Sequence, residues 1–382
     1  MCFCRGCADA SDDAEDDRRY CLKRLLIALL LIPILSSECC AVNTGAFGIG
    51  EAEKQLPEDV RYIAGGIEAD GGYDTSSALS RLGDSALAAM KLELRKNGQL
   101  IASMLSIGLI SALALTMCSD VTMKNFVNII GVCSEATLLL GGMDSLIVSI
   151  TDTMHTLSNY SRAALPAVFT AAAISGAAVS ASAKYGIVCM GLEVLISVSS
   201  KLIIPLVYVY IALSLSTGLY KNTVLEAGKR AVKWCTLTLM TAIPLIFSLL
   251  LNVTGAISGS ADALAVKTAR TVISSVLPVV GGIASDAAST VLSAASMVRA
   301  SAGAMGMTAV CALCIAPFAR LLVRFLSFKA GAAVCNAFSG GTVGSFLDEM
   351  GNASAMLMGL TGCECIMLFV SFSSAIKAVT GF

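Results

Sequence analysis

The chain has 382 residues, of which 56% are hydrophobic and 14% are charged, whereas about 25% of the residues in an ordinary soluble domain are charged. This composition argues against a water-soluble enzyme, and the net charge of -1 gives no indication of nucleic acid as a partner. We therefore predict an all-α polytopic membrane bundle, in which each helix needs about 20 apolar residues to cross the hydrocarbon core.

Residues 1–41 predict an acidic leader followed by a signal peptide. Basic residues at Arg18, Arg19, Lys23 and Arg24 precede the apolar run 25–35, and small residues near Ala41 follow it. This order of basic flank, short apolar run and small residues is typical of an export signal. An uncleaved membrane anchor is the alternative.

Residues 42–97 predict a short extracytoplasmic segment, because acidic residues and paired glycines dominate its first part. Its end, over 75–95, has the apolar periodicity of an amphipathic helix, with Leu79, Leu82 and Leu87 set among charged residues. Such a helix lies on a membrane surface or binds a partner, and the sequence leaves both options open.

Residues 98–382 predict a multi-pass membrane domain. The stretch 186–218 is too long for one ordinary pass, so it is either one kinked helix or two short passes. Two passes place the basic loop near residue 221 in the cytoplasm, where basic loops are favoured. The expected spans are 99–118, 126–142, 163–183, 186–200, 202–218, 234–257, 302–318 and 356–375.

The apolar segment 272–298 is interrupted by Pro278, Gly281, Gly282 and Asp286. If the basic cluster near residue 320 is cytoplasmic, this segment must enter the membrane and return on the same side. A broken hairpin at that depth needs its free backbone groups buried in protein or in a wet cavity. We therefore predict a re-entrant element here.

Charged residues inside the expected spans are the main candidates for function. Each costs at least ~2.5 kcal/mol at the bilayer centre on insertion scales, so they should pair between helices or line a polar pathway. Both readings stay open, and Glu193 with Asp286 is the preferred pathway pair. The charges in question are Glu135, Glu193, Lys201, Asp286 and Glu364. The candidate pathway or re-entrant residues are Glu193, Lys201, Pro278, Gly281, Gly282 and Asp286.

The motifs of common enzyme classes are missing. Gly228-Lys229-Arg230 is a near miss for a phosphate-binding loop, but Thr223 stands where the first glycine belongs. His155 is the only histidine, and most cysteines, including the Cys311/Cys314 pair, sit in apolar runs where they act as small packing residues. We expect a non-enzymatic protein with no catalytic, cofactor-binding or metal-ligating residues.

The segment 265–286, AVKTARTVISSVLPVVGGIASD, resembles the stage III sporulation protein AE family. Members of that family carry a threonine-alanine-rich lead into a Pro-Val-Val-Gly-Gly turn that Asp follows closely. The order of signal peptide, exported segment and apolar segments is similar as well. The resemblance covers about residues 75–382, and the acidic, Cys-rich leader departs from it.

The resemblance implies a component of a channel or secretion-like complex between mother cell and forespore, placed in the mother-cell membrane around the forespore. It implies partners among the stage III sporulation A-operon proteins, including an ATPase and ring-forming members, and indirectly a forespore protein. The implied role is to sustain late forespore gene expression. Two basic segments would be the cytoplasmic docking loops, with Lys221, Lys229, Arg230 and Lys233 in one and Arg320 and Arg324 in the other. The alternative function is a secondary transporter of a small solute, with a midplane site at broken helices.

Overall fold

The computed structural model describes residues 56–64, 75–220, 222–276, 281–339 and 342–377. These residues are almost entirely helical, and no strand occurs among them. This confirms the predicted all-α membrane bundle. The expected signal peptide at 1–41 lies outside the described residues.

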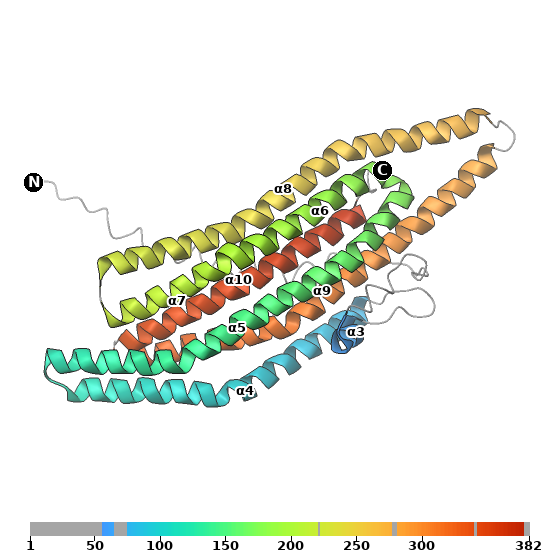
Figure 1. Ribbon diagram of the computed structural model, residues 1–382. Coiled ribbons are helices and arrows are strands. Elements are labelled where there is room, and N and C mark those ends of the chain that lie inside the picture. Colours follow the sequence, from blue (N-terminus) through green and yellow to red (C-terminus); the bar gives the residue numbers. More distant parts are fainter. Residues whose placement is uncertain (1–55, 65–74, 221, 277–280, 340–341, 378–382) are drawn as a thin grey trace, which may run out of the picture.

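Long helical segments run side by side in alternating directions and form one elongated bundle (Figure 1). The connections α4–α5, α7–α8 and α9–α10 meet at one end, which we call the hairpin end. The other end, which we call the terminal end, contains the start of α4, the end of α10, the reversal between α5 and α6, and the α8–α9 connection. The helices are α3 (Glu58–Ala64), α4 (Thr75–Met117), α5 (Val121–Ala172), α6 (Ala178–Val198), α7 (Ile204–Leu219), α8 (Thr223–Val276), α9 (Gly281–Ser339) and α10 (Thr342–Ile376), with π-helical turns η3 (Ala173–Ala177) and η4 (Ser199–Ile203).

The helices are longer than the expected spans. With 52 residues, α5 extends about 78 Å at 1.5 Å per residue, which is more than twice the ~30 Å of the hydrocarbon core. The expected span 126–142 and the first part of 163–183 therefore belong to one helix. Polar residues between them do not stop it, because threonine hydroxyls donate to the preceding turn, as Thr153 does to the Ser149 carbonyl at 2.8 Å.

The chain reverses inside the expected span 163–183. Gly176 in η3 has a φ of 98°, a conformation that glycine adopts at little cost. The first turn of α6 is capped from another helix, since the Asp262 carboxylate of α8 accepts from the Val179 and Ser180 N–H groups at 2.9 and 2.8 Å. These bonds satisfy two donors that a helix start leaves free.

The stretch 186–218 is one helical run rather than two separate passes. From α6 the chain continues through η4 into α7, and Pro205 lies in the first turn of α7. Proline lacks the N–H that an α-helix would use there, and a π-helical turn is one way in which a helix accommodates such a break. The structure therefore has the kinked-helix alternative.

The segment 272–298 is divided between two long antiparallel helices, because α8 ends at Val276 and α9 begins at Gly281. Residues 277–280 between them lie outside the described residues. The expected span 302–318 and the basic cluster near residue 320 both lie within α9. Membrane entry and return of 272–298 stays a prediction.

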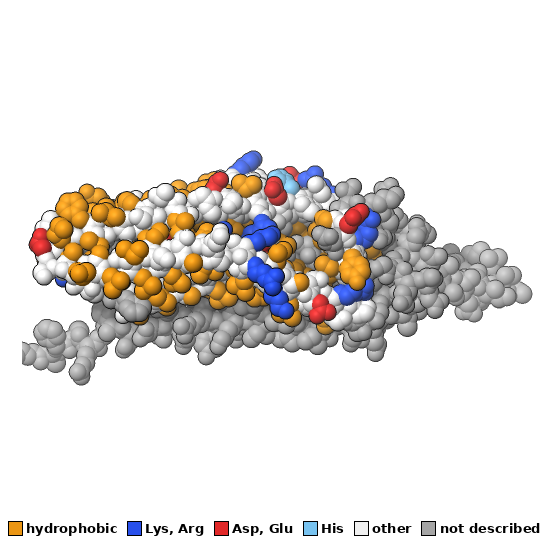
Figure 2. Space-filling model, turned by 90° about the horizontal axis from the view of Figure 1, so that it is seen from below, with side chains coloured by type: hydrophobic (Ala, Val, Ile, Leu, Met, Phe, Trp, Pro, Cys, Tyr) orange, Lys and Arg blue, Asp and Glu red, His pale blue; other side chains and the backbone are white. Residues whose placement is uncertain are grey.

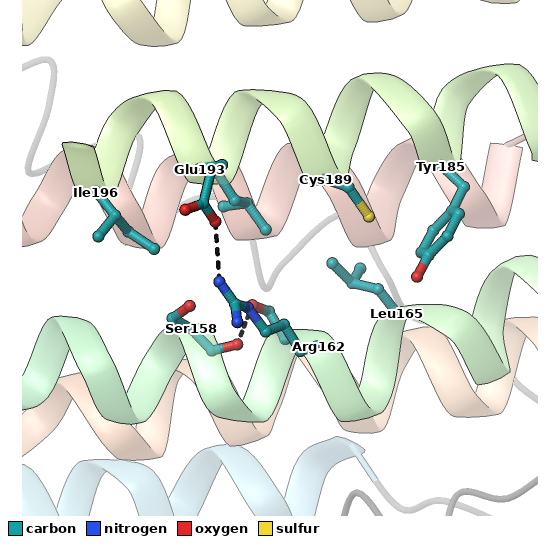
Figure 3. Close-up of a pocket in the computed structure, with 9 residues that line it drawn as sticks. Ser158, Arg162, Leu165, Tyr185, Cys189, Glu193 and Ile196 are labelled. Atoms are coloured by element: carbon teal, nitrogen blue, oxygen red, sulfur yellow. Dashed lines mark hydrogen bonds and ion pairs between the residues drawn. The ribbon is translucent and has the colours of Figure 1, made fainter. Parts of the chain in front are cut away.

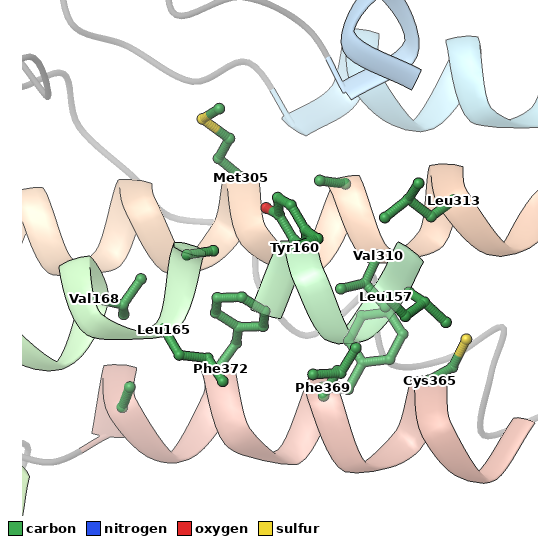
Figure 4. Packing of buried hydrophobic residues seen from close by; sticks show 14 of the residues in the cluster. Leu157, Tyr160, Leu165, Val168, Met305, Val310, Leu313, Cys365, Phe369 and Phe372 are labelled. Carbon is green, nitrogen blue, oxygen red and sulfur yellow. The ribbon is translucent and has the colours of Figure 1, made fainter. Parts of the chain in front are cut away.

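Two hydrophobic cores follow one another along the bundle, and α10 runs through both of them. The core toward the hairpin end contains large side chains such as Leu139, Tyr210, Phe328 and Phe346. In the core toward the terminal end, Phe369 and Phe372 of α10 pack against α5 and α9 (Figure 4). A disulfide joins Cys314 of α9 to Cys365 of α10 in this second core, where the sequence predicted only packing cysteines.

Five described segments are long and apolar enough to cross a membrane. One of them, Val121–Leu219, includes the reversal at Gly176 and therefore contains two antiparallel helical runs. The outer surface supports membrane insertion, because hydrophobic side chains cover much of the face seen from the side of α4 (Figure 2). The chain is thus a multi-pass membrane protein.

Candidate functional site

Near the hairpin end, the Glu349 carboxylate of α10 holds three helices together. It accepts a hydrogen bond from Lys229 Nζ of α8 at 2.8 Å and another from Tyr210 Oη of α7. Asn352, one turn along α10, donates to Glu349 Oε2 at 3.1 Å. The Lys229 and Glu349 side chains are only 15% and 21% exposed, so this ion pair is largely removed from solvent.

A second lysine extends the contact to α9. Lys329 Nζ donates to Asp348 Oδ1 at 2.7 Å and to Asn352 Oδ1 at 3.1 Å. Asn352 therefore bridges the two ion pairs. Two cations and two anions balance within this partly buried network, and a satisfied network favours one arrangement of the helices that supply it. We call it the hairpin-end network; its members are Tyr210, Lys229, Lys329, Asp348, Glu349 and Asn352.

Farther along the bundle, a cavity of about 260 Å³ lies between α5 and α6 (Figure 3). Arg162 of α5 donates to Glu193 of α6 at 2.9 Å across it, and both side chains are more than 65% exposed, at 67% and 69%. Tyr185 and Cys189 line the cavity on the α6 side. Glu193 thus forms an ion pair between helices, which is one of the two roles that the sequence left open.

The cavity presents charged and polar side chains together with a thiol. Its lining includes Ser158 and Cys189 but no histidine, so neither side chain has an imidazole beside it to act as a base. Within the described residues, no three His, Cys, Asp or Glu side chains come together as ligands for a metal ion.

About two thirds of the way along α9, Arg320 connects three helices. Its Nε donates to Glu93 Oε1 of α4 at 3.4 Å, and its Nη1 donates to Ser149 Oγ of α5. Glu93 is buried and also accepts from Asn97 Nδ2 at 3.3 Å. On the next turn of α9, Arg324 Nε and Nη1 are buried and lack a hydrogen-bond partner among the described residues.

Two acids predicted inside spans are buried away from these clusters. Glu135 of α5 is fully buried and neither carboxylate oxygen has a partner among the described residues; the same holds for Glu364 Oε2 of α10. Neither residue lines the α5–α6 cavity. Neither residue forms an ion pair among the described residues. An unpaired buried charge is costly, so these two side chains do not stabilise the bundle through ion pairs.

The other predicted pathway residues are not brought into one site by the described contacts. Lys201 lies in η4 and is exposed. Gly281, Gly282 and Asp286 form the start of α9, where only the backbone is described, and Pro278 lies outside the described residues. A pathway that joins Glu193 to Asp286 stays a prediction.

The predicted docking residues fall into different environments. Lys229 belongs to the hairpin-end network, Arg230 is exposed, Lys233 is half-buried, and Lys221 lies outside the described residues. Arg320 and Arg324 lie within α9 rather than in a loop. A helix can continue through such charges because neighbouring helices supply counter-charges and hydrogen bonds, here Glu93 and Ser149.

Sequence reasoning did not single out Tyr210, Asn352 or Glu93. For Asn352 a weak signal was present, because Asp348, Glu349 and Asn352 share consecutive turns of an otherwise apolar segment. Their partners Lys229 and Tyr210 lie 120 and 139 residues away in the chain, so spacing alone could not join them.

Comparison with known proteins identifies relatives of this sequence. The model of the family described as "Stage III sporulation protein AE (spore_III_AE)" matches residues 70–379. The chain is 26% identical over 249 residues to the stage III sporulation protein AE of Bacillus subtilis (strain 168), a match that covers 63% of this chain and 61% of that protein. No solved structure matches the chain.

Proposed function

The chain belongs to the stage III sporulation protein AE family, and we propose that it is a non-enzymatic, multi-pass membrane component of the channel complex between mother cell and forespore. The observation that carries this proposal is the extent of the family match, because residues 70–379 include every long helix of the bundle. Membership supports a role in sporulation for the membrane domain as a whole rather than for one motif.

The shape of the bundle supports a role in assembly. The helices α8 and α9 have 54 and 59 residues and extend about 81 and 88 Å, so they project well beyond a hydrocarbon core of ~30 Å. Such projections offer surfaces to other stage III sporulation A-operon proteins, including the ATPase and the ring-forming members. Because the chain lacks a phosphate-binding loop, we assign energy coupling to a partner.

In this proposal the protein resides in the mother-cell membrane that surrounds the forespore, and it sustains late forespore gene expression. The hairpin-end network fixes the relative positions of α7, α8, α9 and α10, and the complex is assembled on that rigid unit. Exposed Arg230, next to the network residue Lys229, remains a docking candidate on the same helix.

Complementation in the endospore-forming host tests the proposal. The chromosomal copy is deleted and replaced by the wild type, by Glu349→Ala or by Arg230→Ala, and a late forespore reporter is measured together with protein level in the membrane. We expect the deletion to abolish the reporter signal and the wild type to restore it. A deletion strain with normal late forespore expression would contradict the proposal.

The secondary transporter remains the second candidate because the α5–α6 cavity places a cation and an anion, Arg162 and Glu193, beside a helix broken at η4. Single Glu193→Ala and Asp286→Ala variants separate the two functions. Loss of complex assembly or of forespore gene expression supports the channel component. Selective loss of uptake of one solute, with assembly intact, supports the transporter.

A further inference from the structure

The helix α4 has two halves with different surfaces. From Gly98 to Met117 it carries no charged residue, and Ile110, Leu113 and Met117 point outward with exposed fractions of 67%, 64% and 86%. Before Gly98 the helix is rich in charge. Figure 2, which views the molecule from the side of α4, shows basic side chains beside a hydrophobic region of the surface.

Three exposed cations stand at the border between the two halves. We call Lys91, Arg95 and Lys96 the basic collar; all three are exposed. Between Ser85 and Met117 the only acid is Glu93, and it is buried against Arg320 of α9. Residues two apart on an α-helix point about 200° apart, so Lys91 and Arg95 face away from Glu93. The preceding acid of α4, Asp84, is exposed and lies about 10 Å before Lys91 along the helix.

The position of the collar matches the thickness of a membrane. From Lys96 to Met117 the helix rises about 32 Å, close to the ~30 Å of the hydrocarbon core. A second helix gives a similar spacing, since the exposed Lys201 lies about 27 Å from Leu219 at the hairpin end of α7. The exposed aromatic residue Tyr220 lies at the α7–α8 connection, and aromatic residues are common at membrane interfaces.

We propose that the basic collar binds the headgroups of anionic phospholipids and that the hydrocarbon core lies between the collar and the hairpin end. A cluster of three exposed cations directly beside an exposed apolar stretch of bilayer length fits a charged lipid surface. This lipid interaction goes beyond the proposed sporulation role and does not depend on it. It gives Lys91 and Arg95, at the end of the amphipathic segment 75–95, a membrane-surface role.

Lipid binding by the purified full chain tests the proposal. The protein is immobilised in a neutral detergent and titrated with mixed micelles that carry fluorescent phosphatidylglycerol or phosphatidylcholine. The wild type should bind phosphatidylglycerol more tightly, and added salt should weaken that binding. The double variant Lys91→Gln/Arg95→Gln should bind it about 30-fold more weakly, because each basic residue near an anionic surface contributes about 1 kcal/mol and 1.4 kcal/mol is tenfold.

Two variants serve as controls. Arg81→Gln/Lys267→Gln removes the same charge at positions nearer the terminal end and should bind as the wild type does. Lys91→Arg/Lys96→Arg keeps the charge and should also retain binding. Equal binding of phosphatidylglycerol by the wild type and the collar variant would overturn the proposal, as would equal binding of both lipids by the wild type; an acidic protein partner would then be the better occupant of the collar.

Discussion

Near the hairpin end, charged side chains of α8, α9 and α10 turn inward and pair with one another, whereas farther along the bundle the Arg162–Glu193 pair lies open to the surroundings. Toward the terminal end, inward polar contacts go to the backbone instead, as when Asp262 caps the start of α6. The difference follows from the surroundings that we propose. Lipid around the hairpin half favours inward pairing of its charges, although Arg230 of α8 is exposed there. Charges beyond the collar can remain solvated.

The two cores also differ in the size of the side chains that fill them. The core toward the hairpin end is built of leucine, methionine and phenylalanine, whereas that toward the terminal end has many buried alanines. There a Cβ added at Gly306 would lie 2.4 Å from the ring of Phe372, and one at Gly303 would lie 2.4 Å from Ile376. Small residues allow close backbone approach, and the buried alanines of this half provide many such positions.

The largest effect on stability is expected when a substitution breaks the hairpin-end network. Glu349→Ala leaves Lys229 and Tyr210 without their shared acceptor, and loss of one partner of a largely buried ion pair costs about 3–5 kcal/mol. Thermal unfolding of the detergent-solubilised protein should show a clear drop in midpoint. The exposed Arg230→Ala is the matched control and should leave the midpoint unchanged; equal effects of the two variants would contradict a buried role for Glu349.

The next effect concerns packing in the other half. Gly306→Ala should cost about 1–3 kcal/mol through overpacking, because Phe372 is fully buried and its ring cannot move away. The control is Gly259→Ala on α8, where a Cβ meets no atom within 4 Å. That substitution should be neutral or slightly stabilising, since alanine favours a helix by about 1 kcal/mol. The comparison is made by chemical unfolding, and a neutral Gly306→Ala would rule out close helix approach at this site.

A smaller effect tests the capping of α6. Asp262→Ala removes the acceptor for the Val179 and Ser180 N–H groups, which should cost about 1–2 kcal/mol, as for other helix caps. Hydrogen exchange at the start of α6 should rise locally. Asp262→Asn keeps a carbonyl acceptor and should lose less than half as much; faster exchange spread evenly over all helices would argue against a local cap.

The smallest effect is expected at the exposed pair. A double-mutant cycle on Arg162→Ala and Glu193→Ala should give a coupling of about 0–1 kcal/mol, as surface ion pairs do, and added salt should reduce it. A coupling free energy as large as that of a buried pair would show that this region is enclosed. The contrast between the exposed Arg162–Glu193 pair and the hairpin-end network would then not hold.

The sequence predicted the helical membrane fold and the end of α4, because an uninterrupted apolar stretch followed by Ser119-Asp120 is a strong local signal. Of the charges that it placed inside spans, Glu135 and Glu364 are buried, whereas Glu193 and Lys201 are exposed. It did not predict that α5 and α9 continue through their polar residues, because a hydropathy window treats a charge as the end of a span. In the folded chain, Glu93 and Ser149 accompany Arg320 and allow the helix to continue.

Contacts between distant parts of the chain were beyond the reach of a single sequence. The reversal at Gly176 sits among alanines and serines that look the same on either side of it, and the Asp262 that caps it is 83 residues from Val179. The acceptor of Lys229 is equally remote in sequence. Local patterns fix helix propensity, whereas these positions depend on which helices become neighbours.

The most direct test of the membrane arrangement is a map of reporter fusions in the full chain, with topology reporters inserted after Ser119, Asn222 and Asp262. We expect the reporters after Ser119 and Asn222, both at the hairpin end, to lie on the same side of the membrane. We expect the reporter after Asp262 to lie on the opposite side. Reporters at 222 and 262 on the same side would contradict this arrangement.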